Sequence, residues 1–87
     1  MTPDAAENPI GRITHYYSHL GVGIVDLTDG ELKVGDTIHI KGRHTDFTQP
    51  VDSIQIEHQS VAHAPKGKSV GIRVKDKVRE HDQVFRV

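Results

Sequence analysis

The chain has 87 residues, of which 34% are hydrophobic and 5% aromatic, and its formal net charge at pH 7 is −1. A chain of this length builds one small domain, and its core must come mainly from Val, Ile and Leu, whose β-branched members favour strands. The near-neutral charge favours neither nucleic acid nor a membrane surface as a partner, and the lack of cysteine excludes disulfides and thiolate metal sites.

The first residues differ in character from the rest of the chain. Residues 1–9 are polar and lack the basic and apolar regions of a signal peptide, so we expect a flexible tail there, followed by one domain at 10–87. No stretch approaches the roughly 18 apolar residues of a membrane helix, and we expect no membrane partner. The absence of cysteine fits a cytoplasmic location.

Glycine and charged turn residues divide the domain into short segments that predict strands. The first two strands are expected at 10–17 and at about 20–27, and a change of hydrophobic phase in the second indicates a bulge or strong coiling. Turns follow around Gly30 and Gly35, because glycine adopts positive φ at no steric cost.

The second half of the chain predicts four more strands. Residues 37–41 and 69–75 alternate cleanly between apolar and polar, and 83–87 forms a last short strand. A longer strand at 47–57 contains Pro50, which cannot donate a ladder hydrogen bond, so this strand should be an edge strand or bulged. Six strands without an amphipathic helix predict an all-β fold, a small closed six-stranded antiparallel β-barrel, because closure removes exposed edges.

Motifs in a fixed order carry a first resemblance. They include Gly-Arg-Ile at 11–13, Gly-Glu-Leu-Lys-Val-Gly-Asp at 30–36, and Ala-Pro-Lys-Gly-Lys-Ser-Val-Gly-Ile at 64–72. Over roughly residues 10–87 the chain resembles domain 2 of translation elongation factor Tu, which implies a translation-protein β-barrel. The chain departs from that family at 18–20 and 24–25, in the neighbourhood that helps elongation factor Tu hold the aminoacyl end of tRNA.

Other segments carry a second resemblance. Asp-Phe-Thr-Gln at 46–49, and Arg-Val-Lys at 73–75 ahead of Asp82, are similar to the C-terminal barrel of collagenase-like peptidases. In those proteins the barrel is an accessory domain and not the catalytic part. The two resemblances imply the same fold but different functions.

Two patterns that suggest a cofactor fail on inspection. Gly67-Lys68-Ser69 looks like the end of a phosphate-binding P-loop, but position 62 is Ala62 instead of glycine and a strand follows instead of a helix, so we expect no bound nucleotide. The histidines show no metal-ligand spacing and are interpreted as solvated, with zinc binding as the minor alternative. We therefore predict no metal and no cofactor. The histidines are His15, His19, His39, His44, His58, His63 and His81.

The best candidate for a binding site is basic. Six of the eleven basic residues lie in a stretch whose only acid is Asp76: Lys66, Lys68, Arg73, Lys75, Lys77 and Arg79. Strand alternation places Arg73, Lys75 and Lys77 on one outward face. Such a stripe is suited to contact the phosphates of RNA, or a partner protein, and the alternative is an ordinary solvated face with a protective charged edge.

Two functions follow from these observations. The first is a stand-alone, non-catalytic elongation factor-like barrel that binds tRNA, the ribosome or a translation protein through the six basic residues. The alternative is a protein-interaction module that acts in trans with a separate enzyme such as a collagenase-like peptidase. An enzyme acting alone is the least expected class, because one small barrel leaves little room for a pocket that buries a substrate.

Overall fold

The computed structural model describes residues 8–87, and in that range it consists of ten short β-strands. In those residues no helix is long and apolar enough to cross a membrane. The first strand begins at Asn8, two residues before the predicted domain boundary, while the rest of the predicted tail lies outside the described residues. The strands are β1 (Asn8–Tyr17), β2 (Val22–Asp26), β3 (Leu32–Lys33), β4 (Thr37–Lys41), β5 (Asp46–Pro50), β6 (Ile54–Ile56), β7 (Gln59–Val61), β8 (His63–Ala64), β9 (Ser69–Arg73) and β10 (Gln83–Arg86).

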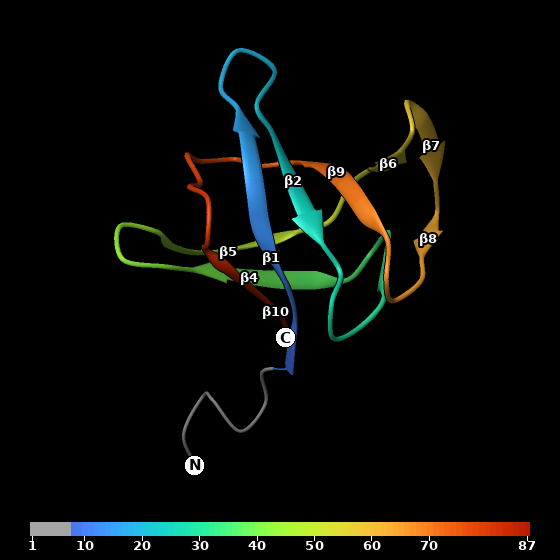
Figure 1. The fold of residues 1–87 in the computed structure, drawn as a ribbon, viewed down its shortest axis with the longest axis horizontal. Coiled ribbons are helices and arrows are strands. Elements are labelled where there is room, and N and C mark those ends of the chain that lie inside the picture. The colour runs from blue at the N-terminus through green and yellow to red at the C-terminus, as the bar shows by residue number, and fades with distance from the viewer. Residues whose placement is uncertain (1–7) are drawn as a thin grey trace.

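Eight of these strands form one curled sheet in the order β5-β4-β10-β1-β2-β9-β6-β7, and β3 pairs with β8 in a separate two-stranded sheet (Figure 1). All of these pairings are antiparallel. The predicted all-β antiparallel class is confirmed. The predicted closed barrel of six strands is not, because the main-chain ladder leaves β5 and β7 as free edges of a half-barrel.

The predicted strand at 47–57 is divided in two, which explains part of the difference. β5 ends at Pro50 and pairs with β4, whereas β6 begins at Ile54 and pairs with β9 and β7. Proline has no N–H to continue the ladder, and the amide of Val51 turns away to donate to the carbonyl oxygen of Asp36 at 2.8 Å. As Pro50 indicated, β5 is an edge strand.

A side chain bridges the seam between β5 and the end of β9. Gln49 Nε2 donates to the carbonyl oxygen of Arg73 at 2.7 Å, and the amide of Lys75 donates to Gln49 Oε1 at 2.8 Å. Gln49 is only 6% exposed, so both hydrogen bonds are largely shielded from water. The side-chain amide of Gln49 thus supplies the donor and the acceptor that the main chain of an adjacent strand would supply in a continuous sheet.

The inward-facing residues of the strands form one aliphatic core. β4 and β9 alternate as the sequence predicts, with Ile38, Ile40, Val70 and Ile72 buried. Burying a side chain of this size stabilises the fold by about 1.5–3 kcal/mol relative to exposure. The largest fully buried side chains are Ile10, Ile13, Leu27, Leu32, Ile38, Ile40, Ile54, Ile72, Val25, Val70 and Val84.

The two predicted turn glycines have different roles. Gly35 has φ 100°, as a turn at 33–36 requires. Gly30 does not have positive φ, and a Cβ there would lie 2.7 Å from Cγ2 of Ile10. Gly30 is therefore needed for close packing against β1, not for the turn geometry that the sequence indicated.

Candidate binding groove

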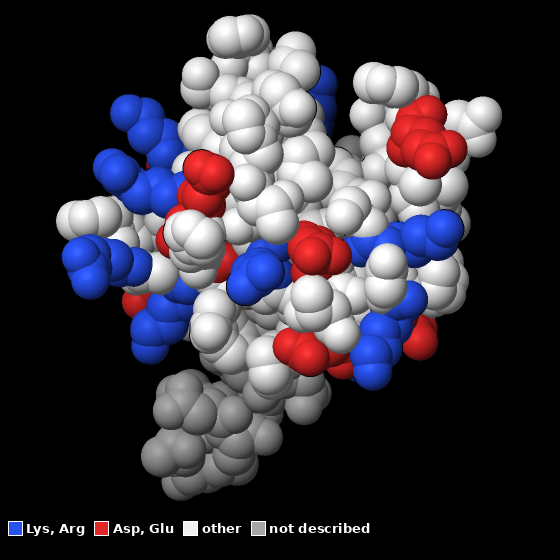
Figure 2. Space-filling view, in the orientation of Figure 1, with Lys and Arg blue, Asp and Glu red and all other residues white. Residues whose placement is uncertain are grey.

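The structure does not gather the six predicted basic residues into one stripe. β9 ends at Arg73, so strand alternation does not extend to Lys75 and Lys77, which lie in the following loop. Lys66 and Lys68 precede the other end of β9. Figure 2 shows Lys and Arg side chains on both sides of this face and near its centre, interspersed with acidic and uncharged side chains.

The loop that carries Lys75, Lys77 and Arg79 is held against the barrel. The Lys75 ammonium lies 5.8 Å from the centroid of the Phe47 ring, and the amide of Arg79 donates to Asp82 Oδ2 at 2.8 Å. Asp82 is only 3% exposed, a buried carboxylate whose structural role sequence reasoning missed. This segment therefore has a clear structural role in covering one end of the core.

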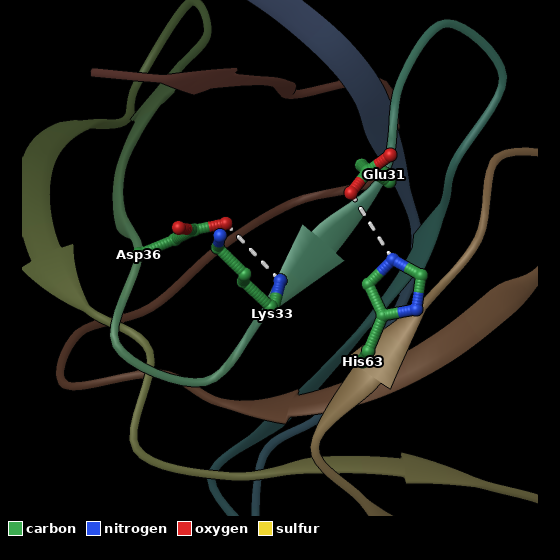
Figure 3. Close-up of polar contacts among 4 residues, drawn as sticks. All are labelled: Glu31, Lys33, Asp36 and His63. Carbon is green, nitrogen blue, oxygen red and sulfur yellow. Dashed lines mark hydrogen bonds and ion pairs between the residues drawn. The ribbon is translucent and has the colours of Figure 1, made fainter.

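Two polar contacts shape the small β3-β8 sheet (Figure 3). The amide of Lys33 donates to Asp36 Oδ2 at 3.1 Å, so the aspartate caps the turn that contains Gly35. His63 Nε2 lies 3.1 Å from Glu31 Oε1 and links β8 to the segment before β3. Both partners of this second pair are half exposed, so it contributes at most about 1 kcal/mol.

A second histidine contact joins β4 and β5. His39 Nε2 lies 2.5 Å from Asp46 Oδ1, and this hydrogen bond holds the pKa of the Asp46 carboxyl below its ordinary 3.8. Desolvation opposes the shift, whereas the charges of His39 and Lys41 assist it. Among residues 8–87, no three His, Cys, Asp or Glu side chains converge in a way that could hold a metal ion. The His39–Asp46 pair therefore links two strands, and the His63–Glu31 pair links a strand to a neighbouring loop.

An apolar cavity lies on the outer face of the sheet, across β2, β9 and β6, and has a volume of about 430 Å³. Ile24 pairs with Gly71, and Gly71 pairs with Gln55, so these three residues lie side by side on that face. Gly71 has no side chain, and a Cβ there would make only ordinary contacts, at 3.4 Å or more. Gly71 therefore forms the floor of an open trench on the outer face of the sheet.

The two walls of this trench differ in polarity. The wall from the β1-β2 hairpin is apolar, and its Tyr17 and Leu20 are 43% and 62% exposed. The opposite wall comes from the β6-β7 hairpin and carries Gln55, Glu57 and His58. Figure 2 shows the notch between the uncharged β1-β2 hairpin and the β6-β7 hairpin with its acidic side chain.

A second cavity of about 220 Å³ extends the trench along β9 and adds Arg73 to its lining. The antiparallel register that pairs Gln55 with Gly71 places Glu57 beside Ser69, at one end of the trench. Arg73 lies at the other end of the trench. Four residues of β9 separate these ends, or about 13 Å at a rise of about 3.3 Å per residue. We call the combined feature the groove; it is lined by Tyr17, Leu20, Val22, Ile24, Ser53, Gln55, Glu57, His58, Ser69, Val70, Gly71, Ile72 and Arg73.

Sequence reasoning missed the groove, although one signal was present. β2 is apolar on both parities, since Val25 is buried while Val22 and Ile24 lie on the opposite face and are only half-buried. In a strand with one face on the core and the other in solvent, apolar and polar residues normally alternate. Apolar side chains on the outward parity therefore indicated a surface suited to another molecule.

Comparison with known proteins relates the chain to peptidases. No protein-family model matches it. It is 41% identical over 78 residues, 88% of the chain, to a collagenase of Porphyromonas gingivalis, and 40% identical over 77 residues to an uncharacterized protease of Methanocaldococcus jannaschii. The chain spans about a fifth of these relatives, 22% of the first and 19% of the second.

Solved structures show the same fold. The C-terminal domain of a putative U32 peptidase from Geobacillus thermoleovorans matches with a TM-score of 0.83, 100% of this chain and 99% of that domain being covered at 19% identity. Its selenomethionine variant also gives a TM-score of 0.83, with 88% and 96% covered at 20% identity. The half-barrel is thus the fold of a domain found within a larger peptidase.

The predicted elongation factor-like function is wrong, because the relatives in sequence are a collagenase and a protease and not translation factors. The predicted partners, tRNA and the ribosome, are unsupported for the same reason. The motifs that suggested translation describe turn geometry: Gly35 and Gly67 have φ 100° and 96°. Such turns specify the fold and carry no information about the ligand.

Proposed function

We propose that this chain is a non-catalytic accessory domain of a collagenase-like peptidase of the U32 type. The observation that carries the proposal is the 41% identity with the Porphyromonas gingivalis collagenase across 88% of the chain. Because the chain corresponds to only 22% of that protein, the catalytic residues of such an enzyme would lie in the remaining part. The domain would act by binding.

The described side chains support this division of labour. The Glu31–His63 pair is half exposed, and Asp46 in the His39–Asp46 pair is largely exposed; each pair joins neighbouring segments of the sheet. The buried polar side chains of Gln49 and Asp82 bond to main-chain groups at the end of β9 and in the loop after it. What the surface offers beyond these structural contacts is the groove, with its exposed apolar wall.

A domain graft tests the proposal. In the Porphyromonas gingivalis collagenase, the segment that matches this chain is either deleted or replaced by the 87-residue chain. Cleavage of gelatin, which is denatured collagen, is measured for both forms and for the intact collagenase. We expect the deletion to lower the rate and the graft to restore a substantial part of it, because the accessory domain completes the assembly.

A second graft supplies the control. An unrelated small β-domain of similar size replaces the same segment, so that any gain from simply filling the space is measured. The proposal fails if the deletion form is as active as the intact collagenase. It also fails if the unrelated domain restores cleavage as well as this chain does.

A further inference from the structure

We infer that the groove is the docking site for an extended segment of the catalytic part of the same peptidase assembly. This inference rests on the proposed function and adds the surface and the kind of segment it binds. The relatives extend over about four fifths of their length beyond the matching region, so a folded accessory domain has a large neighbour to contact. The groove offers that neighbour an apolar wall that water otherwise covers.

The width of the groove selects an extended chain over a helix. β2 and β6 flank β9, and with neighbouring strands about 4.8 Å apart, the two walls rise from strands separated by about 9.6 Å. A helix with its side chains is about 10–12 Å wide and does not fit between them. An extended segment can lie along the trench above Gly71, with apolar side chains against Leu20 and Val22.

Charge defines the segment further. Glu57 lines one end of the groove and Arg73 the other, about 13 Å apart by the strand rise. An extended peptide covers that distance in about four residues. The complementary segment therefore carries a basic and an acidic residue about four positions apart, with apolar residues between them.

The turn that presents Glu57 supports a functional role for this wall. Glu57 and His58 form the two-residue connection of the β6-β7 hairpin, with φ 51° and 67°. Asn-Gly is the favoured pair in such turns, and bulkier residues held at positive φ store local strain. The strained turn places a charged and an imidazole side chain at the mouth of the groove, where Asn-Gly would place neither.

Hydroxyl-radical footprinting with mass spectrometry measures docking directly at the side chains. The isolated chain is compared with the same chain grafted into the Porphyromonas gingivalis collagenase. Labelling of Leu20 should fall at least about threefold in the graft, since docking takes its exposed fraction from 62% to below about 20%. Labelling of Tyr17 should fall in parallel, whereas Val34, outside the groove and equally exposed at 43%, should change little.

Matched variants test the groove with Tyr17 as the unchanged reporter. Gly71→Lys fills the trench floor, where space and φ allow a side chain, and its control is Thr48→Lys on the outer face of β5. Glu57→Lys removes charge complementarity at one end of the groove. We expect Gly71→Lys and Glu57→Lys to restore labelling of Tyr17 in the graft, and Thr48→Lys to leave it protected.

The outcomes separate this inference from the proposed function. If the graft restores gelatin cleavage while Tyr17 and Leu20 remain fully labelled, the proposed function stands and the groove is not the docking site. If both residues are protected but cleavage is not restored, docking stands and the accessory role fails. Protection at Val34 instead of the groove overturns the inference.

Discussion

Replacing Gln49 tests the side chain that bridges β5 to the end of β9. In Gln49→Ala, the carbonyl oxygen of Arg73 and the amide of Lys75 lose their partners at 2.7 and 2.8 Å. The chemistry of these partners also determines the orientation of the glutamine amide, since a carbonyl must face Nε2 and an N–H must face Oε1. The substitution therefore opens the seam without altering the aliphatic core.

The size of the effect follows from burial. Gln49 is 6% exposed, so its partners are poorly placed to bond to water instead. Each buried group left without a partner costs about 1–3 kcal/mol, so the two together should lower the free energy of unfolding by about 2–6 kcal/mol. A domain of about 87 residues has a total stability of roughly 4–13 kcal/mol, so this is a large fraction of it.

Urea unfolding followed by far-ultraviolet circular dichroism measures this change, and the absence of tryptophan makes circular dichroism the better probe. Thr48→Ala is the matched control, because Thr48 is the exposed neighbour on the same strand and should change stability by less than about 0.5 kcal/mol. If Gln49→Ala is no less stable than Thr48→Ala, the seam is not held by this side chain and the reasoning is refuted.

Three further predictions concern single sites. Gly11→Ala should destabilise the fold by about 2 kcal/mol or more, because a Cβ would overlap the carbonyl oxygen of Asp26. The control, Gly71→Ala, should have a stability within about 0.5 kcal/mol of the parent. Thermal unfolding compares the two variants, and equal melting temperatures would contradict the packing argument. Asp82→Ala should lower the free energy of unfolding by about 1–3 kcal/mol, because the amide of Arg79 loses its buried acceptor. An unchanged midpoint of urea unfolding would show that the carboxylate does not stabilise the loop. The folded pKa of Asp46 lies below 3.8, so the stabilisation from its contact with His39 is present above about pH 3.8 and is lost as pH falls through the folded pKa. His39→Phe should raise the pKa of Asp46, measured by ¹³C NMR titration. An unchanged pKa would show that His39 does not cause the lowered pKa of Asp46.

Function illustrates the limit of local motifs. The segments at 30–36 and 64–72 resemble a translation factor, yet the relatives are peptidases. In the structure these segments contain Gly35 and Gly67, which supply the positive φ of two turns. The second resemblance, at 46–49, includes Gln49, whose hydrogen-bond partners lie 24 and 26 residues further along the chain.

The sequence alone determined the local properties of this protein. Alternation of apolar and polar residues predicted the all-β class and the inward faces of β4 and β9, and Pro50 predicted an edge strand. These features depend on side-chain period and on proline chemistry, both of which act within a few residues.

Only the tertiary structure decided which distant segments become neighbours. Alternation assigns a residue to a face but does not name the strand beside it, so the groove across β2, β9 and β6 was not readable from the chain. The same reason applies to the six basic residues, because β9 ends at Arg73 and the following loop turns back over the core. Strand pairing depends on contacts between distant segments, and these contacts stabilise the fold only once the sheet has curled around its core. They place Gly71 between β2 and β6, at the floor of the groove, and Gln49 at the seam between β5 and the end of β9.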